Sequence, residues 1–116
     1  MLRNVVLAFL LVSCSIAAAS EPAVNIKHGF LTGNAYRALS QEARRAYAMG
    51  SIDGMFLAPF FGAKKEKLSW LERCATSMTD EQIAAIFDKY LRDNPGRWHE
   101  TMNALGMVAM KSACGL

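Results

Sequence analysis

The most constraining feature of this sequence is an apolar stripe at helical spacing between residues 79 and 93. Apolar side chains recur there every three or four positions, which is the period of an α-helix with one buried face. Thr79 and Gln82 form a capping box, in which each side chain accepts a hydrogen bond from the other residue's backbone N–H. The stripe predicts an amphipathic helix ending near Asp93, with an apolar face made by Ile83, Ile86, Phe87, Tyr90 and Leu91.

A second helix is expected directly after this one. Asn94 is interpreted as its N-cap and Pro95 as its first helical residue, where the missing N–H of proline has no helical partner to lose. The helix is predicted to run to Ala113, antiparallel to the helix before it. One face would consist of Trp98, Met102, Leu105, Val108, Ala109 and Ser112.

Two further helices are expected upstream. Thr32 can cap a short helix that carries Tyr36, and a longer helix is predicted over residues 41–61. Pro59 predicts a kink or an early end of the longer helix. No strand-like alternation is found, so the expected fold class is all-α, a small bundle of four to five helices. The buried side of the longer helix is expected to contain Ala43, Tyr47, Gly50, Gly54 and Leu57.

Residues 1–19 have the pattern of a secretory signal peptide. Arg3 precedes a short apolar run, and three alanines end the segment at Ala19. Cleavage there would leave residues 20–116 as a single helical domain in the periplasm. The alternative is a lipobox, in which Cys14 would become the lipidated first residue.

The remaining cysteines predict one disulfide. Cys74 and Cys114 are the only two outside the leader, and an even pair in an oxidising compartment is most simply bonded. The antiparallel arrangement of the last two helices also returns Cys114 to the region of Cys74. The bond would add rigidity to a domain of only 97 residues.

Charge and hydropathy exclude two classes of function. Without Arg3, 12 Lys and Arg residues remain against 10 Asp and Glu residues, a net charge of about +2 that does not indicate nucleic-acid binding. No apolar run is long enough to span a membrane.

The chain shows no pattern typical of an enzyme or a metal protein. His28 and His99 have no ligand partners at metal-site spacing, and no Ser nucleophile motif or phosphate loop is present. Asp53 lies among small and apolar residues, which leaves two interpretations: a buried general acid, or a residue that hydrogen-bonds a nearby helix. Five methionines on the helices are interpreted as core or dimer-interface residues. We therefore expect no catalytic activity, no cofactor and no metal.

A charged segment between residues 62 and 69 is the candidate recognition loop. Phe60 and Phe61 precede it and Trp70 follows it, and aromatic flanks around a charged tip suit protein contacts. A solvated loop is the simpler interpretation. The candidate partner-binding residues are Lys64, Lys65, Glu66, Lys67 and Trp70.

Together, several short motifs make the sequence resemble the Rap/Tai-type immunity proteins. Their order and spacing carry the resemblance across nearly all of residues 20–116. The motifs are Phe30-Leu31-Thr32-Gly33-Asn34, Gly50-x-x-Asp53-Gly54, Trp70-x-x-x-Cys74, the cap at Thr79–Gln82 with Ile83, Tyr90-Leu91-x-x-Asn94-Pro95, and the terminal Cys114.

The resemblance implies a function as well as a fold. The family consists of small periplasmic helical proteins, typically homodimers, that neutralise peptidoglycan amidase toxins delivered by type VI secretion. Its implied partner is a cognate effector amidase, blocked by a projecting loop. Ser40 and Ala48 stand where many members carry a further cysteine pair. The alternative function is that of a small periplasmic helical chaperone or stress protein, which an acidic interface would favour.

Overall fold

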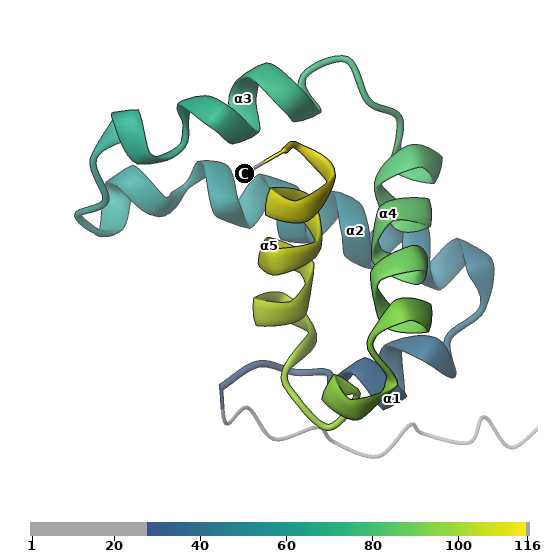
Figure 1. Ribbon diagram of the computed structural model, residues 1–116. Coiled ribbons are helices and arrows are strands. Elements are labelled where there is room, and N and C mark those ends of the chain that lie inside the picture. Colours follow the sequence, from purple (N-terminus) through teal and green to yellow (C-terminus); the bar gives the residue numbers. More distant parts are fainter. Residues whose placement is uncertain (1–27, 116) are drawn as a thin grey trace, which may run out of the picture.

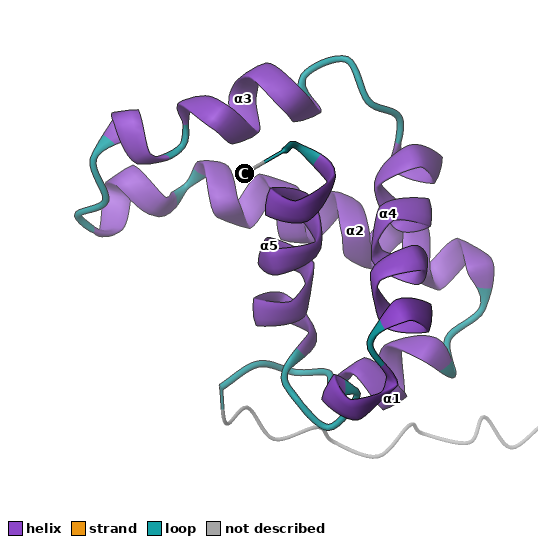
Figure 2. Cartoon of the chain, viewed as in Figure 1, coloured by secondary structure: helices purple, strands orange, loops and turns teal. Residues whose placement is uncertain are grey.

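The computed structural model describes residues 28–115, and the predicted signal peptide and Cys14 lie outside them. Within the described range all regular elements are helical, which confirms the expected all-α fold (Figure 2). An isolated antiparallel bridge pairs Thr32 with Thr101. The five α-helices are α1 (Gly33–Arg37), α2 (Gln41–Phe56), α3 (Ser69–Ala75), α4 (Asp80–Asp93) and α5 (Met102–Ala113), with 3-10 turns at Ala58–Phe61, Lys65–Lys67 and Pro95–Arg97.

The core forms where α4 packs against both α2 and α5. Figure 1 shows α4 and α5 side by side, with α2 crossing behind them. Phe87 lies at the centre of this contact, with its ring edge-on to Tyr36 at 6.1 Å between centroids. The largest fully buried side chains are Tyr36, Leu71, Phe87, Leu91, Met102, Leu105 and Met110.

The start of α4 confirms the predicted capping box. The Thr79 hydroxyl accepts from the Gln82 N–H at 3.2 Å, and the Gln82 side-chain oxygen accepts from the Thr79 N–H at 2.8 Å. The helix ends at Asp93 as expected, and its buried face includes Ile83 and Phe87.

The prediction of one continuous helix from Pro95 to Ala113 is wrong. In such a helix the Trp98 carbonyl would accept from the Met102 N–H. Instead, that carbonyl accepts from the Asn34 N–H at 2.9 Å, and the Met102 N–H donates to Leu31 at 2.8 Å. Contacts with the N-terminal segment thus replace the helical hydrogen bonds, and α5 begins only at Met102.

The interpretation of Asn94 as an N-cap is also wrong. Its side chain makes no cap hydrogen bond to the turn that follows. Its side-chain amide donates instead to the Tyr90 carbonyl at 2.9 Å, in the last turn of α4. Asn94 therefore closes the preceding helix.

Two motifs of the family resemblance, at residues 30–34 and 90–95, meet near the end of α4. Gly33 is buried, and a Cβ on it would lie 3.1 Å from Leu91 and 3.1 Å from the Trp98 backbone. The Gly33 N–H also donates to the Glu100 carbonyl at 3.0 Å. These motifs therefore have a structural role, because their contacts hold the start of the described chain against the segment between α4 and α5.

The expected buried face of α2 is wrong at several positions. Pro59 does end the helix early, as predicted, since α2 stops at Phe56. However, Gly50 and Gly54 are exposed, with no atom within 4 Å of a Cβ built on either. Leu57 is exposed as well. The residues that α2 buries are Ala48, Ile52 and Met55.

The glycines of α2 and α5 give a paired test of this packing. Gly50→Ala is expected to stabilise the protein by up to about 1 kcal/mol, because alanine favours a helix and its methyl group meets nothing. Gly106→Ala is expected to destabilise it, because the added Cβ would lie 2.9 Å from the buried Phe87 ring. Thermal melts of both variants measure the difference. A loss of stability in Gly50→Ala would contradict the open surroundings of this glycine.

The predicted disulfide is confirmed. Cys74 in α3 is bonded to Cys114, which directly follows α5, with 5.9 Å between their Cα atoms. The bond joins α3 to the end of α5, which belongs to the core.

Candidate interaction surface

A helical hairpin projects from the bundle. In Figure 1 the end of α2 extends beyond α4 and α5, the chain reverses, and α3 leads back towards the bundle. We call residues 56–68 the hairpin tip. It contains the last residue of α2 and the first two 3-10 turns.

The reversal depends on Gly62. This residue has φ +98°, in the left-handed region where glycine avoids the cost of a Cβ. Its N–H donates to the Pro59 carbonyl, and the next N–H, that of Ala63, donates to Ala58. This pair of hydrogen bonds is the Schellman pattern that ends many helices. The turn therefore separates the apolar part of the tip from its charged part.

The apolar part of the tip is unusually exposed. Phe60 and Phe61 are 84% and 88% exposed, and Phe56 and Leu57 are 38% and 50% exposed. Aromatic side chains of this size contribute most to binding when a partner covers them. The tip thus carries the most exposed large apolar side chains in residues 28–115.

The charged part contains four of the five predicted recognition residues. Lys64, Lys65, Glu66 and Lys67 are all exposed, and three of them form the second 3-10 turn. Trp70 differs from these four because it is half-buried in α3 and packs against the core. Its ring lies 6.0 Å from the Lys111 ammonium group of α5. Trp70 therefore anchors the hairpin, and the other four residues form its surface.

The sequence placed the apolar run before Gly62 at the end of a predicted helix and identified Phe60 and Phe61 only as flanks of the charged segment. A usable signal was present, because Pro59 ends the helix and the residues beyond it cannot continue a buried helical face. Phe60 and Phe61 directly follow that proline.

The other residues considered for catalysis or metal binding do not form a site among the described residues. His28, His99 and Asp53 are all exposed, so the hypothesis of Asp53 as a buried general acid is wrong. Met49 is also exposed, which excludes the core for this methionine and leaves its interpretation as a dimer-interface residue a prediction. No three His, Cys, Asp or Glu side chains of the described residues are grouped so that they could hold a metal ion.

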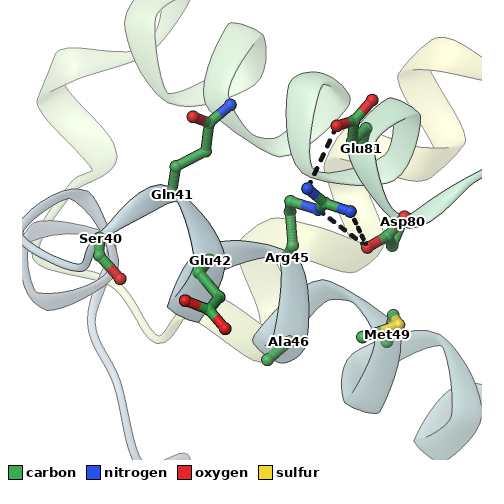
Figure 3. A pocket seen from close by; sticks show the side chains of 8 residues that line it. All are labelled: Ser40, Gln41, Glu42, Arg45, Ala46, Met49, Asp80 and Glu81. Carbon is green, nitrogen blue, oxygen red and sulfur yellow. Dashed lines mark hydrogen bonds and ion pairs between the residues drawn. The ribbon is translucent and has the colours of Figure 1, made fainter.

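A hollow of about 740 Å³ lies between the first turns of α2 and α4 (Figure 3). The Arg45 guanidinium crosses it and contacts Asp80 at 2.8 Å and Glu81 at 3.1 Å. The hydrogen bond from Arg45 holds the pKa of the Asp80 carboxyl below its ordinary value. These charges are already paired within the protein, and the hollow is open and shallow. We therefore place the candidate site at the hairpin tip.

No protein-family model, curated protein or solved structure gives a significant match to this chain. Among the described residues, no helix combines the length and the apolar character needed to cross a bilayer.

Proposed function

We propose that this chain is a periplasmic immunity protein that binds and blocks a peptidoglycan amidase toxin of a type VI secretion system. The observation that carries the proposal is the hairpin tip, which is exposed, chemically distinct and attached to a braced helical scaffold. A binding surface held in this way loses little conformational entropy when a partner covers it.

The bracing of the hairpin supports a blocking role. Leu71 and Ala75 of α3 are buried, and Cys74 between them is bonded to Cys114. Ser69 adds a hydrogen bond from its hydroxyl to the Glu66 carbonyl at 2.9 Å. An inhibitor needs no reactive group of its own, because filling the cleft of an enzyme is sufficient.

The alternative, a small exported chaperone or stress protein, has less support. That function would be favoured by a free acidic interface. Along the contact between α2 and α4, Asp80 and Glu81 pair with Arg45, and Asp88 lies 3.4 Å from Arg44. These acids are therefore already paired with arginines of the same chain.

The lysines of the tip provide a direct test. In the variant Lys64→Ala/Lys65→Ala/Lys67→Ala, affinity for the cognate amidase should fall about tenfold, at roughly 0.5 kcal/mol for each exposed charge. Its dependence on salt should weaken as well. Calorimetry at two salt concentrations measures both effects. A search of the neighbouring reading frames for an amidase-like toxin comes first, because it supplies the partner to test.

A matched variant controls for charge alone. Arg37→Ala/Lys89→Ala/Arg92→Ala also removes three positive charges, all from exposed positions on α1 and α4, outside the hairpin. It should bind with unchanged affinity. Equal affinities for all three proteins, with unchanged thermal melts, would contradict a role for the lysines. The homodimer implied by the resemblance belongs to the same proposal, and sedimentation velocity measures it.

A further inference from the structure

The apolar part of the hairpin tip needs an explanation of its own. Phe60 and Phe61 are almost fully exposed, and each adds a large apolar area to the surface. A blocking loop could act through its lysines alone. Two adjacent rings in water therefore point to a further contact.

The local backbone indicates what kind of surface could cover both rings. Phe60 and Phe61 are neighbours in a 3-10 turn, in which successive side chains point about 120° apart. A flat, rigid partner can cover one of two such rings well, but not both. A fluid interface can surround both, because its molecules rearrange around the tip.

The adjacent charges favour an anionic interface. Lys64, Lys65 and Lys67 follow the rings within a few residues. Glu66 is the only carboxylate between Asp53 and Glu72, so this stretch of the chain has a net charge of +2. Aromatic residues flanked by lysines suit the boundary between lipid headgroups and acyl chains, where the rings insert and the ammonium groups meet phosphates.

The position of the tip makes such a contact possible. Figure 1 places it at the far end of the hairpin, away from α4 and α5. The folded bundle can therefore remain outside the lipid while the tip inserts.

We propose that the hairpin tip docks on an anionic phospholipid surface, with Phe60 and Phe61 inserted at the interface and Lys64, Lys65 and Lys67 on the headgroup phosphates. This inference goes beyond the proposed function, because it assigns the tip a lipid contact when no protein partner covers it. The complementary charge of the lysines and the divergence of the two rings carry it.

Vesicle co-sedimentation tests the proposal. The protein is expressed from the full chain, its N-terminus is sequenced, and it is mixed with vesicles of phosphatidylcholine with or without phosphatidylglycerol. We expect sedimentation with the phosphatidylglycerol vesicles that weakens at high salt, and little with phosphatidylcholine alone. Phe60→Ser/Phe61→Ser should lower the bound fraction at least about tenfold, because both apolar anchors are lost.

The matched control is Phe30→Ser, which removes another exposed phenylalanine, 58% exposed, from a different part of the molecule. It should bind vesicles like the unchanged protein. All the replaced side chains are exposed, so circular dichroism and thermal melts should agree among the proteins. The proposal is overturned if the unchanged protein ignores anionic vesicles, or if Phe60→Ser/Phe61→Ser binds them equally well.

Self-association is the competing explanation for the exposed rings, and sedimentation velocity distinguishes it. If a second copy covers the tip, the unchanged protein would form a dimer that Phe60→Ser/Phe61→Ser dissociates, and neither protein would bind vesicles. That result would also overturn the lipid contact. The amidase assays remain independent, because their variants leave Phe60 and Phe61 unchanged.

Discussion

Removing the disulfide with Cys74→Ser/Cys114→Ser is expected to lower the free energy of unfolding by about 4 kcal/mol. The bond closes a loop with a sequence separation of 40 residues, and its loss restores that conformational freedom to the unfolded chain. A domain of this size has only about 5–15 kcal/mol of net stability, so a large fraction is lost. Thermal melting should show a decrease of about 15–30 °C.

The reductant response is the control for this variant. Dithiothreitol should lower the melting temperature of the unchanged protein towards that of Cys74→Ser/Cys114→Ser, and should leave the variant itself unaffected. Equal melting temperatures of the two oxidised proteins would contradict a stabilising role for the bond.

The loss of stability should be largest in the hairpin. The bond links α3 to the end of α5, whereas α4 is held by its contacts with both α2 and α5. Hydrogen exchange in the variant should therefore accelerate more in residues 69–75 than in residues 83–91. Equal acceleration in both segments would mean that α3 is as firmly held as the core without the bond.

Phe87→Ala is expected to destabilise the protein by about 3–5 kcal/mol, the range for removing a buried phenylalanine ring. The side chain is fully buried, and its ring fills the space beside Gly106 and Tyr36. Neither neighbour can fill the cavity, because Gly106 has no side chain and Tyr36 is itself fixed in the core. Urea unfolding followed by circular dichroism measures the change.

A neighbouring residue on the same helix provides the control. Ile86 is only half-buried, so Ile86→Ala should cost clearly less than Phe87→Ala. Phe87→Leu should fall between the two, because leucine keeps part of the buried volume. If Phe87→Ala and Ile86→Ala cost the same, Phe87 would not be the centre of the core.

The sequence alone determined the features that depend on near neighbours. The capping box at Thr79 and the apolar stripe behind it define α4, because the groups that interact lie within a few residues of one another. Pro59 stops α2 through its own ring and missing N–H. The pairing of Cys74 with Cys114 followed from their number and from two consecutive antiparallel helices. The charged surface at Lys64–Lys67 was likewise recognisable from local composition.

Only the tertiary structure decided features that depend on distant groups. α5 begins at Met102 because the Trp98 carbonyl and the Met102 N–H bond to residues 64 and 71 positions earlier, and no local pattern contains those partners. The face of α2 was ambiguous because small and apolar residues surround the helix, so contact with α4 selected Ala48 and Ile52 over Gly50 and Gly54. The almost complete exposure of Phe60 and Phe61 was decided in the same way, because the sequence identified them only as flanks of the charged segment. Aromatic rings are normally expected in a core, and here the projecting hairpin places them beyond its reach.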